Sequence, residues 1–261
     1  MIESIYYNAN IALNYIEGPK NGDPILLVHG NLSRWQAFSP IIPDLIEGMH
    51  VYALDLRGHG KSTHHPGTYT LQNHVVDIAA FIKEKIGQPV TLFGKSLGGM
   101  VGFMAAANHP ELIRRIIVAD SPLTLETLRP HVAAQREFAY RILHFLRSNQ
   151  IKEMYKEVND DFSSESFSVC DPDLIVATFD RFEENINEYD IKKLFPLIHC
   201  PVLIMRGEEK LGSMITNADI DVAVKLLPQL KHYQIPGVGH SLLDNKEIVL
   251  EKLKHFLQSN S

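Results

Sequence analysis

The sequence predicts an α/β fold, a doubly wound and mostly parallel eight-stranded sheet with a helical insertion. Three observations predict it. Short, fully apolar runs, typical of strands buried on both faces, recur along the chain. Segments with helical spacing alternate with them, which favours right-handed βαβ units. One long interval, residues 123–196, interrupts this alternation with helical patterns, such as those at 132–146 and 174–186, and no convincing strand.

The first elements are strands. Residues 4–17 alternate between polar and apolar side chains, which predicts a hairpin. Pro24 to Val28 and His50 to Leu54 are apolar runs that predict buried strands. Residues 71–86 have apolar side chains at helical spacing, and Gly87 is expected to end that helix.

The remaining elements complete the sheet and divide the chain. They are strands at 90–93, 115–119, 201–205 and 232–235, with helices at 100–108 and 246–258. The alternation predicts a core made of residues 1–122 and 197–261, with residues 123–196 as a helical cap. Such a cap is expected over the sheet edge where α/β proteins bind ligands, excluding water and shaping the pocket. An ordinary packed helical layer is the alternative.

The composition narrows the class of protein. Of the 261 residues, 45% are hydrophobic and 21% charged, which is typical of a globular protein. A net charge of −6 without a basic run argues against a nucleic-acid partner. The sequence shows no signal-peptide pattern and no apolar run long enough to span a membrane. Two isolated cysteines indicate a reducing compartment, so we expect a cytoplasmic protein. The sequence has no His-Glu-x-x-His motif and no Cys/His quartet, so we expect neither a metal nor a cofactor.

The segment Gly94-Lys95-Ser96-Leu97-Gly98-Gly99 carries the most specific motif. A serine with glycines two residues away on each side, between a strand and a helix, matches the Gly-x-Ser-x-Gly nucleophile elbow. A tight turn with glycines for packing is the simpler interpretation. Gly-Lys-Ser at 60–62 and at 94–96 also suggests a phosphate-binding loop. That motif needs an upstream glycine where Asp55 and Pro89 stand, so it is excluded.

Four segments together resemble one family. They are His29-Gly30-Asn31, the stretch 55–62, the elbow, and Gly237-Val238-Gly239-His240. In order and spacing the chain resembles the α/β-hydrolase superfamily, in the capped branch that includes bacterial carboxylesterases. The resemblance implies Ser96 as nucleophile and His240 as general base. It also implies an oxyanion hole made by the backbone N–H groups of Leu97 and Asn31.

The acid that completes the triad is the open question. The family's usual acid position, after the strand at 201–205, holds Lys210. Asp120 is the candidate we favour, because it follows a strand at the expected catalytic edge, where the resemblance implies that some branches of the family place their acid. The order nucleophile, acid, base is then kept. Asp219, Glu208 and Glu209 are the alternatives.

Lys95 is a second departure from the family pattern, which more often has histidine, tryptophan or glutamate before the nucleophile. A surface-reaching lysine, or one paired with a carboxylate, is the interpretation we favour. Alternatively, its charge raises the local positive potential beside the nucleophile.

The expected function is hydrolysis of a small carboxylic ester through an acyl-enzyme. Hydrolysis of a carbon–carbon bond or a lactone, acyl transfer, and a slow-turnover small-molecule receptor are alternatives with the same residues. Dehalogenation is disfavoured, because those enzymes place an aspartate where Ser96 stands. Aromatic side chains in the insertion suggest a substrate with an apolar portion, unless they only pack the cap: Phe138, Tyr140, Phe145, Tyr155, Phe162, Phe167, Phe179 and Phe182.

Overall fold

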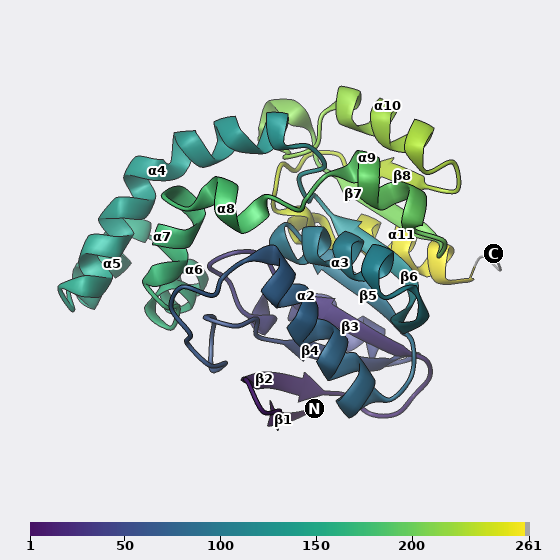
Figure 1. Cartoon of the computed structure of the whole chain (residues 1–261), viewed down its shortest axis with the longest axis horizontal. Coiled ribbons are helices and arrows are strands. Elements are labelled where there is room, and N and C mark those ends of the chain that lie inside the picture. The colour runs from purple at the N-terminus through teal and green to yellow at the C-terminus, as the bar shows by residue number, and fades with distance from the viewer. Residues whose placement is uncertain (259–261) are drawn as a thin grey trace.

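The fold is built around one eight-stranded sheet, as the sequence predicts (Figure 1). A computed structural model describes residues 1–258. The strand order is β1-β2-β4-β3-β5-β6-β7-β8. β1 and β2 form an antiparallel hairpin, β2 pairs antiparallel with β4, and the other pairs are parallel. The strands are β1 Ile2–Tyr7, β2 Ala12–Glu17, β3 Pro24–Val28, β4 His50–Leu54, β5 Val90–Lys95, β6 Ile113–Ala119, β7 Val202–Arg206 and β8 Lys231–Gln234.

Helices cover both faces of the sheet, because side chains of the buried strands alternate between them. α2, α3, α9 (Ile191–Leu194) and α10 contribute to the core on one face, while α1 and α11 pack on the other. The core helices are α1 Ile42–Leu45, α2 Leu71–Ala80, α3 Leu97–Asn108, α10 Asn217–Leu226 and α11 Lys246–Gln258. α2 continues as a π-helical segment, Phe81–Ile86, and ends as expected at Gly87, whose φ is +74°.

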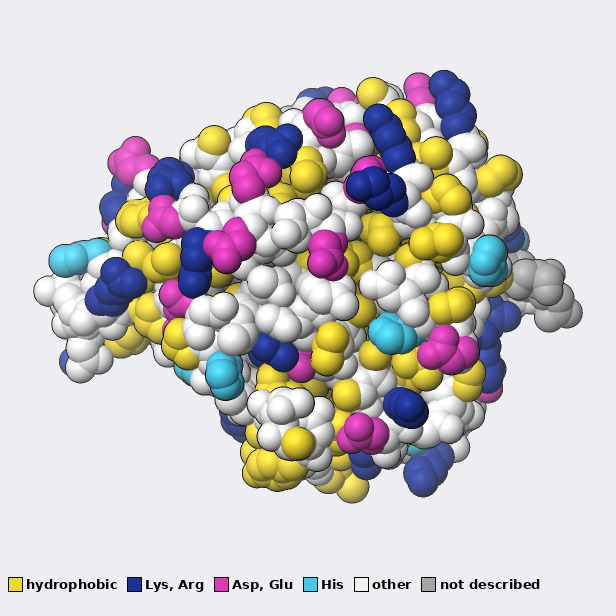
Figure 2. All heavy atoms as spheres, viewed as in Figure 1, with side chains coloured by type: hydrophobic (Ala, Val, Ile, Leu, Met, Phe, Trp, Pro, Cys, Tyr) yellow, Lys and Arg dark blue, Asp and Glu magenta, His cyan; other side chains and the backbone are white. Residues whose placement is uncertain are grey.

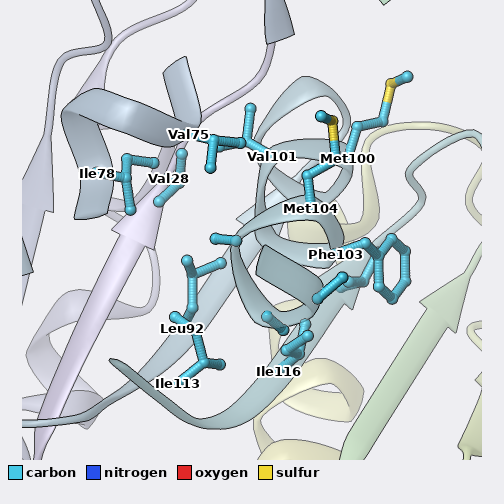
Figure 3. Packing of buried hydrophobic residues seen from close by; sticks show 14 of the residues in the cluster. Val28, Val75, Ile78, Leu92, Met100, Val101, Phe103, Met104, Ile113 and Ile116 are labelled. Atoms are coloured by element: carbon cyan, nitrogen blue, oxygen red, sulfur yellow. The ribbon is translucent and has the colours of Figure 1, made fainter. Parts of the chain in front are cut away.

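α3, the helix that follows the elbow, lies in the centre of one core layer (Figure 3). Its small residues allow close contact with the sheet: a Cβ at Gly102 would lie 2.7 Å from the Leu92 side chain. Larger side chains of α3 pack against α2, β3, β5 and β6. The close-up shows Met100, Val101, Phe103 and Met104 beside Val28, Val75, Ile78, Leu92, Ile113 and Ile116. This packing fixes the start of α3 at the end of β5.

Between β6 and β7 the chain forms helices only. They are α4 Leu125–Arg147, α5 Ile151–Val158, α6 Asp161–Ser168, α7 Asp173–Phe179, α8 Phe182–Ile186 and α9 Ile191–Leu194. The helix expected at 174–186 is split after Phe179, whose carbonyl accepts a hydrogen bond from the Arg136 guanidinium instead of continuing the helix. Part of the insertion has a hydrophobic cluster of its own around Met154 and Ile175.

The surface mixes charges of both signs. On the face in Figure 2, Lys and Arg side chains are interspersed with Asp and Glu side chains. Across residues 1–258, none of the helices combines the length and the apolar character needed to cross a bilayer.

Candidate active site

Ser96 lies in a sharp turn between β5 and α3, with a left-handed φ of 52° and ψ of −119°. Neighbouring backbone comes too close for any side chain at the flanking glycines. A Cβ at Gly94 would lie 2.3 Å from the Gly98 carbonyl, and one at Gly98 would lie 2.1 Å from the Val28 carbonyl oxygen. The two glycines of the motif are therefore sterically required, and the strain is concentrated at Ser96.

Two further non-glycine residues with positive φ lie at the same edge of the sheet. Leu32 (φ 53°) is in the loop after β3, and Asp120 (φ 47°) directly follows β6. Parallel strands end together at one edge of a sheet, so these residues and Ser96 lie around one location. Strained backbone of this kind clusters at ligand and catalytic sites in proteins.

Asp120 and His240 are hydrogen-bonded, with 2.8 Å between Oδ2 and Nδ1. Asp120 is fully buried, whereas the His240 side chain is 37% exposed. The Asp120 carboxylate also accepts from the Ser213 hydroxyl (2.5 Å) and from the backbone N–H of Met214 (2.9 Å) and Gly207 (3.4 Å). An ionised carboxylate can only accept, so Nδ1 of His240 carries a proton, and in the neutral ring Nε2 is then the nitrogen with the lone pair. That nitrogen is the one a general base uses.

The other acids considered from the sequence have different partners. Asp219 caps α10 and accepts a hydrogen bond from the Thr124 hydroxyl at 2.8 Å. Glu208 accepts from the backbone N–H of Gly237 at 2.7 Å, and its pKa is lowered first by that bond. Glu209 accepts from the first backbone N–H of α10 at 2.6 Å. The structure therefore brings Asp120, and none of these three, to His240.

The expected oxyanion residues lie beside Ser96. Asn31, Leu97 and Ser96 line one pocket, and a Cβ at Gly30 would lie only 3.1 Å from the Ser96 Cβ. Leu97 is the first residue of α3, where backbone N–H groups have no acceptor within the helix. The Asn31 side chain donates to the Thr178 hydroxyl of α7 at 2.9 Å. Its amide group is thus engaged with the insertion.

Two buried histidines support the loop that precedes Leu32. His29 accepts the backbone N–H of Leu56 through Nε2 (3.0 Å) and donates through Nδ1 to the Gly30 carbonyl (2.7 Å). His59 accepts the backbone N–H of Leu32 (3.0 Å) and donates to a carbonyl (2.9 Å). A backbone N–H can only donate, so both rings are neutral. Burial lowers the pKa of His29 to about 4 and that of His59 to about 3.

Because these two histidines are neutral in the folded protein, we expect the protein to lose stability when the pH is lowered. Their folded-state pKa values lie below the unfolded value, so their contribution is complete above about pH 6.5 and lost as the pH falls towards 4. Each histidine is expected to lower the free energy of unfolding by about 1.4 kcal/mol per pH unit in that window. Burial raises the pKa of Asp55 and Asp77, which opposes part of the slope. Urea unfolding at pH 7, 6 and 5 measures how the free energy of unfolding depends on pH. The same free energy at all three pH values would contradict the prediction.

Lys95 ends β5 with its side chain largely enclosed. Burial lowers the pKa of its ammonium group, while the charges of Asp244 and Asp120 oppose that shift. Within residues 1–258 the ammonium forms no ion pair at 4.0 Å or less, so the pairing considered from the sequence is not found.

A cavity of about 350 Å³ opens beside Ser96 and His240. Its size is at the lower end of small-molecule pockets. Helices α4, α6, α7 and α8 of the insertion form much of its wall. The aromatic residues considered from the sequence divide accordingly. Phe138, Phe167, Phe179 and Phe182 line the cavity, whereas Tyr140, Phe145 and Tyr155 pack within the insertion and Phe162 lies against Arg34.

A family model described as the α/β hydrolase fold matches residues 23–247. The chain belongs to this family. A serine hydrolase-like protein of Homo sapiens is 36% identical over 110 residues, and the match covers 41% of this chain and 54% of the human protein. A Haemophilus influenzae protein provisionally named an esterase/lipase is 26% identical, with 96% of this chain and 88% of that protein covered.

Solved structures show the same fold over almost the whole length of this α/β hydrolase. E-2-(acetamidomethylene)succinate hydrolase aligns with a TM-score of 0.79, at 22% identity and with 99% of each chain covered. The enol-lactonase from Burkholderia xenovorans LB400 aligns with a TM-score of 0.78, at 18% identity, covering 98% of this chain and all of that one.

Sequence reasoning missed three residues at the site of this α/β hydrolase. Ser213 and Met214 hold Asp120, and His74 contributes to the cavity wall. No motif marks them. The available signal was position, because Ser213 and Met214 lie between β7 and α10, where the chain returns to the catalytic edge of the sheet.

Proposed function

We propose that this α/β hydrolase is a serine hydrolase that cleaves carboxylic esters through an acyl-enzyme. Ser96 is the nucleophile, His240 the general base and Asp120 the acid that orients it. The observation that carries the proposal is the 2.8 Å bond between Asp120 and His240 at the pocket that also contains Ser96. A serine hydroxyl becomes reactive only when a positioned base removes its proton, and this pair supplies one.

The reaction follows from those positions. Ser96 Oγ attacks the ester carbonyl carbon while His240 Nε2 takes its proton. The tetrahedral intermediate collapses when His240 returns that proton to the leaving alcohol, which breaks the carbon–oxygen bond and leaves the acyl group on Ser96. Water then loses a proton to His240 and attacks the acyl carbon. The second tetrahedral intermediate collapses when His240 returns that proton to Ser96 Oγ, which breaks the bond to the acyl carbon and releases the acid. Asp120 stabilises the imidazolium in each half-reaction.

Backbone N–H groups of Leu97 and Asn31 are proposed to bind the developing oxyanion. The positive end of the α3 dipole points to the same place, because Leu97 begins that helix. Loss of one such donor typically costs about 3–4 kcal/mol of transition-state stabilisation. A backbone donor survives side-chain replacement, so replacing Asn31 should have a smaller effect than the loss of the donor itself.

The insertion is proposed to act as a cap domain over this site. Residues 123–196 would form the cap, and 1–122 with 197–261 the catalytic core, of which 259–261 lie outside the described residues. The wall that α4, α7 and α8 contribute to the cavity supports this division. The substrate is proposed to be a small ester with an apolar portion, and lactones, which are cyclic esters, fit the same chemistry. The free thiols of Cys170 and Cys200 are consistent with a cytoplasmic location.

Covalent labelling tests the proposed nucleophile. A fluorophosphonate is expected to add one adduct per chain, located by peptide mass spectrometry on Ser96, because only an activated serine displaces its fluoride. Ser96→Ala should remain unlabelled. Ser121→Ala is the matched control, since Ser121 is buried next to Gly99 but lies outside the cavity wall, and it should label as wild type does. An unlabelled wild type, or a labelled Ser96→Ala, would refute the assignment.

A further inference from the structure

The cavity beside Ser96 has an uncharged wall. Among the described residues that line it, none is Asp, Glu, Lys or Arg. Its titratable side chains are Tyr69, whose hydroxyl donates to Asp171, and three histidines, His74, His131 and the proposed base His240. Moving a carboxylate from water into such a site is unfavourable unless a fixed cation or several donors replace its hydration. The wall therefore discriminates against an anionic substrate.

Most polar side chains in the wall already have partners or contact solvent. The Asn31 amide donates to Thr178, and the Asn185 amide donates to a backbone carbonyl at 2.7 Å. His131 uses Nδ1 for the Thr127 carbonyl, again at 2.7 Å. Gln135 is exposed to solvent. None of these is a buried group that needs a ligand.

His74, on α2, is different. The residue is 2% exposed, and its Nδ1 is buried without a hydrogen-bond partner. Across residues 1–258, no hydrogen bond is found to either nitrogen of its ring. The His59 ring lies on one side, with 6.4 Å between the ring centroids, and the cavity lies on another. Nδ1 is enclosed by protein, so the nitrogen that a ligand in the cavity can reach is Nε2, which has no partner among the described residues and is not fully enclosed. Buried polar groups in proteins are almost always hydrogen-bonded, so an unpartnered ring nitrogen in a pocket wall indicates a position for a ligand atom.

We propose that the pocket selects uncharged esters and that His74 hydrogen-bonds a polar group, such as a hydroxyl, on the substrate. The proposal rests on the proposed ester hydrolase function and names its substrate class. His74 acts as a specificity residue, away from the reacting bond.

The state of the His74 ring supports this ligand chemistry. Burial first, and then the neighbouring His59, Arg57 and His29, place the pKa of His74 well below its usual value. The charge of Arg57 is itself engaged by Asp77 at 2.6 Å. A neutral imidazole has one donor and one acceptor nitrogen, and a hydroxyl can satisfy either of them. A carboxylate would find no matching positive charge.

Three matched p-nitrophenyl esters test the proposal: those of hexanoic acid, 6-hydroxyhexanoic acid and, as the monoester, adipic acid. They differ at the end of the acyl chain, which is a methyl, a hydroxyl or a carboxylate. We expect kcat/KM for the adipate ester to be about 100-fold or more below that of the hexanoate ester, because its charge is left unpaired. Similar values for these two esters would overturn the inference that the wall excludes anions.

Variants of His74 test its specificity role. In His74→Phe, the ratio of kcat/KM for the hydroxyhexanoate ester over the hexanoate ester is expected to fall about tenfold, since the ring can no longer form the bond. His74→Gln retains a donor and an acceptor and should restore much of the ratio. If His74 had only a structural role, its replacement would lower kcat/KM for both esters by the same factor. An unchanged ratio in His74→Phe would therefore overturn the specificity role.

A binding measurement separates this inference from the proposed function. Ser96→Ala protein is titrated calorimetrically with methyl hexanoate, methyl 6-hydroxyhexanoate and monomethyl adipate. The hydroxy ester should bind most tightly and the adipate most weakly. If that order is found while wild type hydrolyses no ester, the pocket inference stands and the proposed function fails. If wild type hydrolyses esters but the adipate binds best, the function stands and the inference fails.

Discussion

Replacing Ser96 with alanine is expected to lower kcat for short p-nitrophenyl esters by about 10⁴- to 10⁶-fold, the range seen when a triad nucleophile is removed. The proposed oxyanion donors and the pocket remain, but no acyl-enzyme can form. Steady-state rates for wild type and Ser96→Ala measure the effect. Across the described residues, the Ser96 side chain forms no hydrogen bond in this structure, so the melting temperature should change little.

A control variant and one contradicting outcome decide how that experiment is interpreted. Ser121→Ala, which alters a buried serine close to α3, should retain the wild-type rate, so a loss specific to Ser96 reports the nucleophile. Equal rates in wild type and Ser96→Ala would exclude Ser96 as the nucleophile and, with it, the acyl-enzyme mechanism.

Replacing Asp120 with asparagine has the second largest expected effect. Oδ2 of Asp120 accepts from both His240 and the Met214 N–H, so the amide oxygen should take that place and the amide nitrogen should face the Ser213 hydroxyl. The tautomer of His240 then survives, but the negative charge does not. At an effective dielectric constant of about 20 that charge is worth about 4 kcal/mol to the imidazolium, or about 10³-fold in kcat.

Two of the other acids considered from the sequence provide control variants for Asp120→Asn. Asp219→Asn should retain activity within a few-fold, because the Asp219 side chain bonds to Thr124 and to the start of α10. Glu208→Gln should do the same, because glutamine keeps an acceptor for the Gly237 N–H in the loop that carries His240. A larger loss in either variant than in Asp120→Asn would move the acid to that residue. Melting temperatures of all three variants separate a folding defect from a catalytic one.

The sequence predicts most of the sheet because its strands are short apolar runs buried on both faces. Residues 24–28 and 50–54 are strands with the predicted bounds. The insertion is less predictable, since its helix ends depend on distant partners. α4 begins at Leu125, several residues before the apolar periodicity at 132–146, because Thr124 caps it. α7 ends where Arg136 of another helix takes the Phe179 carbonyl.

The site divides in the same way between local and distant determinants. The Ser96 elbow is encoded by its own glycines, and that turn could be predicted from a few residues. The pairing of Asp120 with His240 depends on a loop that places Ser213 and Met214 around the carboxylate, which no local pattern specifies. No sequence motif identifies His74, because the lack of a hydrogen-bond partner for its ring becomes apparent only in the folded structure.

The bond from Asn31 to Thr178 has a consequence for engineering this enzyme. α7 supplies the acceptor that holds Asn31 of the proposed oxyanion hole, so exchanging the whole proposed cap for that of a relative would alter turnover along with substrate range. A library confined to α4 would change only one wall of the cavity and leave that bond in place. Directed evolution for new substrates is therefore best begun at Val132, Phe138 and Ala139 of α4.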